Sequence, residues 1–363
     1  MARLGDVCQK ATSNIAQKDL ENRNGEYEIY GASGFIKKVD FYQQENPYIA
    51  VVKDGAGIGR VMKLPAKTSV IGTMQYIIPN NDIDISYLAY AMENMNLAKY
   101  YTGATIPHIY FKDYQKEELP VPSLEEQRKI AAVLDKVSDL IVKRRQQMEK
   151  LDLLIKARFV EMFGDPVSNP KQWETKGLAE LGECKNGMNF HTEDSGIDIH
   201  CLGVGDFKDL SYITDTSMLP MISLDKMPSN EYLLQNGDIV FVRSNGNKDL
   251  VGRSIAVFPD QVLTTFSGFC IRFRLKSSVV QVDYLLRVLK TDSIRKKMAG
   301  RGANIQNLNQ KILSDLQIPI PPLDLQNQFS VFVEQTEQTK ISIKESFTKL
   351  ETLKKALMQE YFG

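Results

Sequence analysis

A cluster of polar and basic side chains follows an apolar run in the second half of the chain. Residues 238–242 read Asp-Ile-Val-Phe-Val, which is typical of a buried strand, and the loop 243–253 then carries Arg243, Asn245, Asn247, Lys248 and Arg253. Arginine, lysine and asparagine make paired hydrogen bonds with the edges of guanine and adenine. Ordinary loop composition would explain any one of these residues. The cluster as a whole predicts contact with a nucleic acid.

Similar loops occur at three other places. A second loop in the same half follows the basic segment 295–297 and contains Arg301 and Asn304. The first half has a loop at 53–60 after the apolar run 48–52, and another around 103–108. These two loops supply Lys53, Arg60, Thr105 and His108 as candidate DNA contacts. A pair of such loops in each half favours binding more strongly than any single residue does.

Other chemistries have weaker support in the sequence. The glycines of 55–59 depart from the G-x-G-x-x-G spacing of nucleotide loops, so we expect a turn there and keep S-adenosylmethionine binding as the alternative. Four candidate zinc ligands match no knuckle spacing, namely Cys184, His191, His200 and Cys201. The chain has 3 histidines, which leaves few groups for acid–base or triad catalysis. We therefore predict no catalytic residue, no metal site and no cofactor in this chain.

Length and composition limit the class of protein. The 363 residues predict two to three domains, and 43% hydrophobic with 25% charged residues is ordinary globular usage. No apolar run is long enough to cross a bilayer, no secretory leader is evident, and 4 cysteines are too few for a disulfide framework, so we expect a cytoplasmic protein without membrane contact. Basic and acidic residues balance at 45 each, which excludes a globally basic nucleic-acid binder. Residues 241–311 are locally basic, and their counter-charges lying nearby in the fold is an equal alternative.

The chain repeats itself. The segment Leu-Pro-Val-Pro-Ser-Leu at 119–124 reappears as Ile-Pro-Ile-Pro-Pro-Leu at 318–323, an offset of 199 that continues without a gap to the last residue. The same offset relates Gly-Ala-Thr-Ile at 103–106 to Gly-Ala-Asn-Ile at 302–305. Two units are too few for a stacked solenoid, so we infer a duplicated domain.

Each copy ends in a long predicted helix. Ser123 is a favourable N-cap, and no proline or glycine follows it until Gly164. Apolar positions then alternate four and three apart, which predicts a heptad seam in both helices and favours packing of one helix on the other over two independent amphipathic helices. The seam contains Ile130, Leu134, Val137, Ile141, Met148 and Leu151 in the first helix, and Phe329, Val333, Ile343, Phe347 and Leu350 in the second.

The resulting fold prediction is an α+β protein with two mixed domains. Strands are expected at 48–52, 74–78, 238–242 and 268–275, and short helices at 85–100 and 282–298. We divide the chain into a first mixed domain at 1–118, a first long helix at 119–164, a linker at 165–173, a second mixed domain at 174–317 and a second long helix at 318–363.

This arrangement resembles the specificity (S) subunit of type I restriction-modification enzymes over essentially the whole chain. The resemblance rests on the duplicated plan, on Leu-Pro-Val-Pro-Ser-Leu-Glu-Glu-Gln-Arg-Lys-Ile at 119–130 with its echo at 318–329, on Phe-Val-Glu-Met-Phe-Gly-Asp-Pro at 159–166, and on Gly-Asp-Ile-Val-Phe-Val-Arg-Ser-Asn-Gly-Asn at 237–247. It implies two target recognition domains that each read half of a bipartite DNA site. It also implies an antiparallel coiled coil with pseudo-two-fold symmetry that sets the gap between the half-sites.

The resemblance also implies partners. Two modification subunits would methylate adenine in double-stranded DNA, and restriction subunits are an optional further partner. S-adenosylmethionine, ATP and Mg²⁺ would then sit on those partner subunits. A coiled-coil assembly scaffold and a free-standing S-adenosylmethionine-dependent methyltransferase remain the alternatives. If the helices act as a ruler, inserting one heptad within 131–154 should lengthen the gap and leave both half-sites unchanged.

Overall fold

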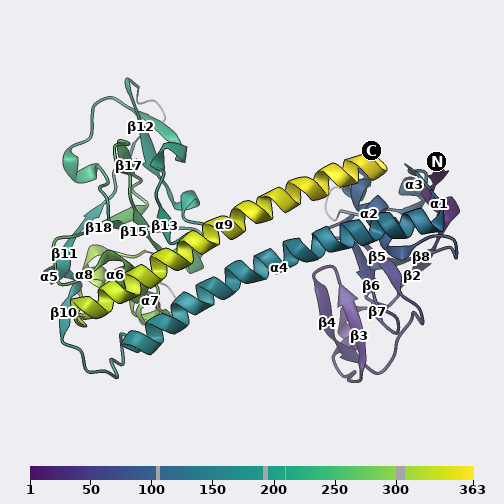
Figure 1. Ribbon diagram of the computed structural model, residues 1–363, viewed down its shortest axis with the longest axis horizontal. Helices are drawn as coiled ribbons and strands as arrows, with labels where there is room; N and C mark the ends of the chain where they lie inside the picture. The colour runs from purple at the N-terminus through teal and green to yellow at the C-terminus, as the bar shows by residue number, and fades with distance from the viewer. Residues whose placement is uncertain (104–106, 191–194, 209, 300–306) are drawn as a thin grey trace. The chain divides into compact units, whose positions relative to one another are not determined.

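The chain divides into two compact units, each built around one of the predicted recognition domains. The computed structural model describes residues 1–103, 107–190, 195–208, 210–299 and 307–363. Unit 1 comprises residues 1–147 and 342–363, and unit 2 comprises residues 148–341 (Figure 1). The division crosses both long helices, so each unit contains the beginning of one helix and the end of the other.

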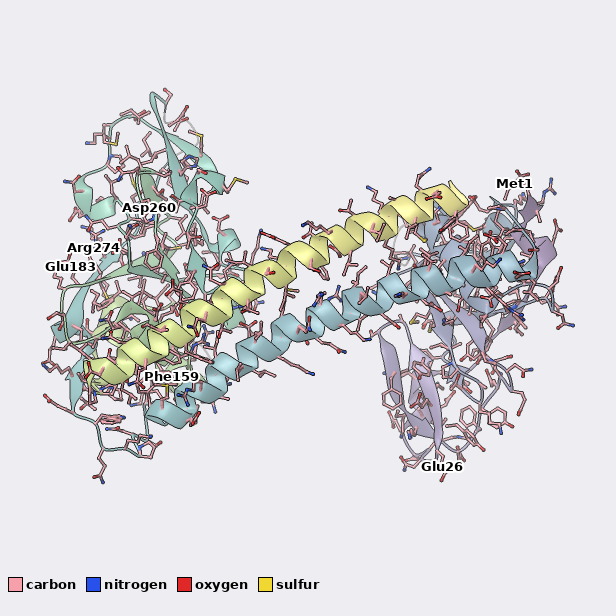
Figure 2. The ribbon with its side chains drawn as sticks, in the orientation of Figure 1. Met1, Glu26, Phe159, Glu183, Asp260 and Arg274 are labelled. Carbon is pink, nitrogen blue, oxygen red and sulfur yellow. The ribbon has the colours of Figure 1, made fainter. Side chains whose placement is uncertain are left out.

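Unit 1 is built on an antiparallel sheet with the strand order β2-β8-β5-β6. These strands are Cys8–Thr12, Met74–Pro79, Tyr48–Val52 and Val61–Leu64. A smaller sheet, near Glu26 in Figure 2, has the order β4-β3-β7 with Gly34–Val39, Tyr27–Gly31 and Ser69–Val70, and β1 (Ala2–Arg3) pairs with β9 (Glu118–Leu119). The helical segments of the domain are α1 Leu4–Val7, η1 Gln17–Leu20, α2 Ile85–Asn94, η2 Leu97–Tyr100 and α3 Phe111–Tyr114.

Unit 2 repeats this plan with one more strand. Its main sheet has the order β11-β18-β15-β16-β13, with Gly182–Asn186, Cys270–Leu275, Asp238–Val242, Ser254–Val257 and Tyr212–Ile213. The order β14-β12-β17 joins Met221–Leu224, Ile197–Leu202 and Thr264–Phe266, and β10 (Thr175–Gly177) pairs with β19 (Gln317–Pro319). The helical segments are α5 Leu178–Leu181, η3 Val204–Asp206, η4 Thr216–Met218, η5 Asn230–Tyr232, η6 Lys248–Leu250, α6 Val282–Leu289, α7 Asp292–Ala299 and α8 Gln310–Ser314.

The predicted elements are present, with changes at their ends. The strands at 48–52 and 238–242 match β5 and β15, and every residue of both strands is buried. The helix expected over 85–100 ends at Asn94, and the left-handed backbone of Asn96 (φ +48°) separates it from η2. The segment 282–298 forms two helices, because Thr291 accepts a hydrogen bond from the Ile294 amide and starts α7. The strand expected at 268–275 begins at Cys270.

The two long helices are the clearest success of the sequence prediction. Helix α4 spans Leu124–Phe163 and α9 spans Leu323–Phe362, each 40 residues long. The Ser123 hydroxyl caps α4 by accepting from the Glu126 amide at 3.3 Å. The start of α4 lies against the end of α9 in unit 1, and the start of α9 lies against the end of α4 in unit 2, so the helices run antiparallel. Among the described residues, no helix is long and apolar enough to span a membrane.

The predicted seam lies between the helices and is most buried near their ends. Ile130, Leu134 and Val137 are buried in unit 1, and Phe329 and Val333 are buried in unit 2. The remaining seam positions are half-buried, namely Ile141, Met148, Leu151, Ile343, Phe347 and Leu350. Polar contacts supplement this middle part, with Arg144 donating to Ser346 at 3.2 Å and Lys340 pairing with Asp152 at 2.7 Å. The seam is therefore strongest where the helices meet the globular parts.

A buried glutamine ties α4 to the domain of unit 1. Gln127, in the first turn of α4, is 1% exposed. Its carbonyl oxygen accepts from the Asp84 amide at 2.9 Å, and its amide nitrogen donates to the carbonyls of Asp82 and Pro122 at 3.2 and 3.0 Å. One side chain thus satisfies backbone groups from two segments and fixes the direction in which the helix leaves the domain.

The same glutamine recurs in unit 2, 199 residues later. Gln326 accepts from the Gln281 amide at 2.8 Å and donates to the carbonyls of Val279 and Pro321 at 3.0 and 2.8 Å. We call Gln127 or Gln326 with its three partners the clamp. The sequence repeat is therefore also a repeat of individual hydrogen bonds.

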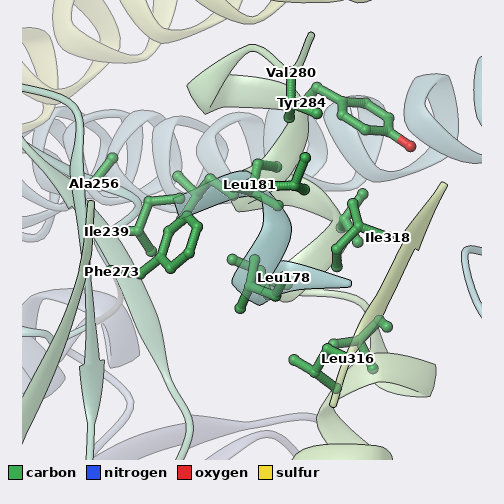
Figure 3. Packing of buried hydrophobic residues seen from close by; sticks show 14 of the residues in the cluster. Leu178, Leu181, Ile239, Ala256, Phe273, Val280, Tyr284, Leu316 and Ile318 are labelled. Carbon is green, nitrogen blue, oxygen red and sulfur yellow. The ribbon is translucent and has the colours of Figure 1, made fainter. Parts of the chain in front are cut away.

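An aromatic contact completes each junction of helix and domain. In unit 2, Tyr284 donates to the Pro319 carbonyl at 2.9 Å and packs on Phe163 at the end of α4, with 4.7 Å between ring centroids. Phe159 and Phe329 join this cluster, and α5 and the sheet close the core beside it, where Figure 3 shows Leu181 near Phe273. In unit 1, Tyr87 donates to the Pro120 carbonyl at 2.7 Å and packs on Phe362 at 5.1 Å. Each domain therefore holds the start of its own helix and the end of the other one.

Candidate nucleic-acid interface

The loop after the central strand is closed by equivalent backbone hydrogen bonds in both domains, although it is longer in unit 2. We call this loop A; it comprises residues 53–60 in unit 1 and 243–253 in unit 2. In unit 1, Val52 exchanges backbone hydrogen bonds with Arg60 at 3.0 Å and with Gly59 at 2.8 Å. In unit 2, Val242 makes the equivalent bonds with Arg253 at 2.9 Å and Gly252 at 2.8 Å. Both glycines have positive φ, +79° and +77°, which glycine adopts without steric cost, so the two hairpins close through the same backbone conformation.

Two further loops meet loop A. Loop B precedes β8 or β18 and comprises 71–73 and 267–269; loop C is described at 101–103 and 107–109 in unit 1 and at 307–308 in unit 2. The first amide of loop A donates to a loop B carbonyl, from Lys53 to Thr73 at 3.0 Å and from Arg243 to Phe269 at 2.8 Å. The first carbonyl of loop A accepts from loop C, from the Ile109 amide at 2.9 Å and the Leu308 amide at 2.7 Å. Three loops therefore converge in each domain on one backbone scaffold.

The structure brings together two of the four residues predicted in unit 1, Lys53 and His108. Lys53 lies in loop A, where its ammonium group is 3.4 Å from the carboxylate of the neighbouring Asp54. His108 of loop C contacts the same carboxylate and packs against Tyr110. Arg60 is turned away from this group and donates to the Ala32 carbonyl at 2.7 Å. Thr105 lies outside the described residues.

Several residues predicted in unit 2 hold loop A in shape. Asn245 accepts from the Asn247 amide at 2.8 Å, and Asn247 accepts from the Asp249 amide at 3.0 Å, so each asparagine forms a turn and keeps its NH₂ group for other partners. Arg243 donates to the Gly268 carbonyl of loop B at 3.2 Å. Arg253 donates to the Lys208 carbonyl at 2.8 Å, which corresponds to the contact of Arg60 in unit 1. The Lys248 side chain, Arg301 and Asn304 lie outside the described part of the chain.

Ion pairs within the domain, buried at Asp238 and exposed at Glu183, take up several of the basic residues at 241–311. Arg272 is 1% exposed and lies 3.8 Å from the Asp238 carboxylate, and burial lowers the pKa of its guanidinium. Arg274 donates twice to Asp238, at 2.8 and 2.7 Å. Lys276 pairs with Glu183 at 2.6 Å, and Figure 2 labels Glu183 and Arg274 on the neighbouring strands β11 and β18. The counter-charges lie nearby in the fold, so the local basic surplus is a weak argument for a polyanion.

The alternatives from the sequence meet structural obstacles. Residues 55–59 form the turn of an antiparallel hairpin between β5 and β6, whereas a dinucleotide loop joins a strand to a helix whose N-terminus binds the phosphates. This segment does not fit S-adenosylmethionine in that way. Among the described residues, no group of three or more histidine, cysteine, aspartate or glutamate side chains is arranged to hold a metal ion, and His191 of the candidate zinc set lies outside them.

Loop B was missed by the sequence analysis. Its residues Thr73 and Phe269 are exposed and lie against loop A, but neither is basic, so a search for charged and amide side chains passed over them. A signal was present: Ile-Gly-Thr-Met at 71–74 aligns with Ser-Gly-Phe-Cys at 267–270 in the repeat. Asn307 of loop C could have been found in the same way, because it aligns in the repeat with the predicted site residue His108.

Comparisons with known proteins agree on one family. A family model described as "Type I restriction modification DNA specificity domain" matches residues 1–150 and 170–355. The chain is similar to the StySPI specificity subunit of Salmonella potsdam, with 23% identity over 94% of this chain and 80% of that protein. It is also similar to the MjaVIII specificity subunit of Methanocaldococcus jannaschii, with 26% identity over 90% of this chain and 83% of that one.

Solved structures share the fold. The S subunit of a type I restriction-modification system from M. genitalium aligns with a TM-score of 0.64 at 16% identity, covering 100% of this chain and 95% of that one. A chain from a study of type I complex assembly and conformational transition aligns with a TM-score of 0.55 at 16% identity, covering 99% of this chain and 96% of that one. At such identities these likenesses support the architecture of two mixed domains and two long helices.

Proposed function

The chain belongs to the family of type I restriction-modification DNA specificity domains, and from this premise we propose that it reads a bipartite DNA site for a type I restriction-modification complex. One observation carries the proposal: the three loops converge through equivalent backbone hydrogen bonds in both domains and carry different side chains. A duplicated protein suits two separated half-sites, because protein symmetry maps onto half-site geometry. Because the loop side chains differ between the two domains, we expect the two DNA half-sites to differ in sequence.

The proposal assigns this chain recognition without catalysis. Basic loop residues would contact phosphates and set the register, while the loop tips would contact base edges. Two modification subunits would dock on the chain and methylate adenine, with restriction subunits joining in some assemblies. S-adenosylmethionine, ATP and Mg²⁺ would bind to those partners, and the complex would work in the cytoplasm.

Methylation-aware long-read sequencing of the host genome tests this function. The genome is sequenced from the parent strain, from a strain lacking this gene, and from the deletion strain complemented with the intact gene. We expect one methyladenine motif of two parts with a fixed gap to disappear on deletion and return on complementation. A methylome that is the same in all three strains contradicts the proposal and favours the scaffold.

Two binding measurements separate the alternatives. The purified complex of this chain with its modification subunits should bind DNA with an affinity that falls steeply with salt, because each neutralised phosphate releases counterions. A scaffold predicts no such slope. Calorimetry of the isolated chain with S-adenosylmethionine should show no binding, whereas a free-standing methyltransferase would bind it.

A further inference from the structure

Three positions around the converging loops are equivalent in backbone and different in chemistry. Loop A contributes Asp54 or Ser244, loop B contributes Thr73 or Phe269, and loop C contributes His108 or Asn307. An isolated antiparallel bridge joins the first and third positions in both domains, Asp54 with His108 and Ser244 with Asn307. The amide of the first position points to the loop B carbonyl in both domains, at 3.2 and 3.4 Å. We call each set of three residues a triplet.

The triplet of unit 2 borders a hollow of about 460 Å³. Its three side chains line this hollow together with Asn245, Gly246 and Val204. Phe269 is 62% exposed, although the residues on both sides of it are buried. Single exposed apolar side chains are common on protein surfaces, so the exposure of Phe269 gains its meaning from its place in a hollow lined otherwise mainly by amide and hydroxyl groups. The hollow thus offers one apolar wall and several amide and hydroxyl groups.

This chemistry matches one base pair. In the major groove, thymine presents a methyl group. Its partner adenine presents one acceptor and one donor, and an asparagine amide can form a hydrogen bond with each of them. Phe269 suits the methyl group, and Asn307 suits the adenine edge. The triplet of unit 1 has no apolar member: the Asp54 carboxylate accepts from the amino group of cytosine, and the His108 ring beside it can donate to guanine.

We propose that each triplet selects one base pair in its half-site and that the two half-sites differ at this base pair. Ser244, Phe269 and Asn307 would select an A·T pair, and Asp54, Thr73 and His108 would select a G·C pair. The proposal rests on the DNA-recognition function above and deepens it. Equivalent backbone bonds hold the three positions in both domains, so one triplet can be exchanged for the other at these positions although loop A is longer in unit 2. It also explains why loop B, which contains no basic residue in either domain, is part of both interfaces.

The test selects DNA from a library with two randomised half-sites, using the complete complex with its modification subunits. The intact chain, Phe269→Thr and the triple exchange Ser244→Asp, Phe269→Thr and Asn307→His are compared. Phe269→Thr should reduce the preference for A·T at one position of the second half-site by about tenfold, the usual effect of one mismatched pair. The triple exchange should change that position to G·C and leave the first half-site and the gap as they were.

A matched variant and a modified DNA complete the design. Leu263→Thr changes an exposed apolar residue at the other end of β17 and should leave every position unchanged. Deoxyuridine in place of thymine at the selected position removes only the methyl group, so it should weaken binding severalfold for the intact chain and not for Phe269→Thr. Phe269→Leu keeps an apolar contact and should keep the preference.

The outcomes distinguish the two proposals. If the intact complex selects a bipartite site and both exchanges select the same site with the same preference, the triplet assignment is overturned and the recognition function stands. If deoxyuridine weakens both chains equally, Phe269 does not read the methyl group and the assignment is overturned as well. If the intact complex selects no bipartite site at all, the recognition function itself fails.

Discussion

The two domains agree where they join the long helices and differ where their loops end. At the junctions, Gln127 and Gln326 make the same three hydrogen bonds, and Tyr87 and Tyr284 bond to equivalent proline carbonyls. In the loops the connecting backbone bonds are kept and the side chains differ. Unit 1 has a carboxylate, a hydroxyl and an imidazole where unit 2 has a hydroxyl, a phenyl ring and an amide. The connecting hydrogen bonds are therefore kept in both places, and the loops vary in length and in side-chain chemistry. This is the division expected of a protein that must place two unlike recognition surfaces on one frame.

Lengthening the frame should have the largest effect. The helices run antiparallel, so one heptad has to be inserted in both, between Gln147 and Met148 in α4 and between Ile341 and Ser342 in α9. Seven residues add about 10 Å, or about 3 base pairs, to the gap. We expect library selection to return the same half-sites with the longer gap, and affinity for the original spacing to fall about 10³-fold or more, toward non-specific binding.

Insertion within 131–154 of α4 alone, which the sequence by itself predicted would lengthen the gap, is instead the matched control, because the antiparallel pair needs both helices lengthened. It moves half of the seam out of register and should lower the melting temperature without producing a new defined gap. An unchanged gap after insertion in both helices would show that the helices do not measure the spacing.

Removing a ring from the junction should reveal a difference between the two units. Phe163 is buried against Tyr284, Phe159 and Phe329, whereas the equivalent Phe362 is half-buried and packs on Tyr87. Phe163→Ala should destabilise unit 2 by about 3 to 5 kcal/mol, because it empties a closely packed site. Phe362→Ala should cost unit 1 about half as much. Urea unfolding followed by hydrogen exchange in each unit measures both values, and equal losses would show that the two junctions are packed alike.

Breaking the clamp should produce a smaller but matched loss in the two units. Gln127→Leu and Gln326→Leu each leave two carbonyls and one amide without a partner in a buried site. At about 1 kcal/mol for each group, we expect a loss of about 3 kcal/mol in the free energy of unfolding. Gln328 is an exposed glutamine of α9, so Gln328→Leu makes the same chemical change outside the clamp. This control should change stability by less than about 0.5 kcal/mol. A loss confined to one unit would show that the repeated hydrogen bonds do not contribute equally.

The junctions were largely predictable from sequence because their signals are local. The cap at Ser123, the glycine at 164 and the heptad spacing predict the first helix, and an offset of 199 without gaps carries the prediction to the second. The segments given to the helices, 119–164 and 318–363, begin five residues before Leu124 and Leu323, because Leu119 and Ile318 belong to β9 and β19. Buried strands such as β5 and β15 were equally clear, because a short run of apolar β-branched residues has few other uses.

The loop tips were not predictable for a physical reason. Loop A is longer in unit 2, and further insertions follow it, so the offset changes from 190 at Lys53 and Arg243 to 199 at Ile109 and Leu308. The bonds that join these residues link segments far apart in the chain. Charge was also a misleading guide. Arg272 lies in a predicted strand, yet only the fold reveals that it is buried beside Asp238.

The smallest effect should come from the tyrosine hydroxyls at the junctions. Tyr87→Phe and Tyr284→Phe each remove one hydrogen bond to a proline carbonyl and keep the ring that packs on the helix end. We expect a loss of about 1 kcal/mol for each, with the larger loss at Tyr284 because the bond to Pro319 is fully buried and its carbonyl is left without a partner. Tyr101→Phe, at an exposed tyrosine of unit 1, should leave the urea midpoint unchanged. A larger loss at Tyr87 than at Tyr284 would reverse the order of burial and show that the hydroxyl in unit 1 does more than hold its junction.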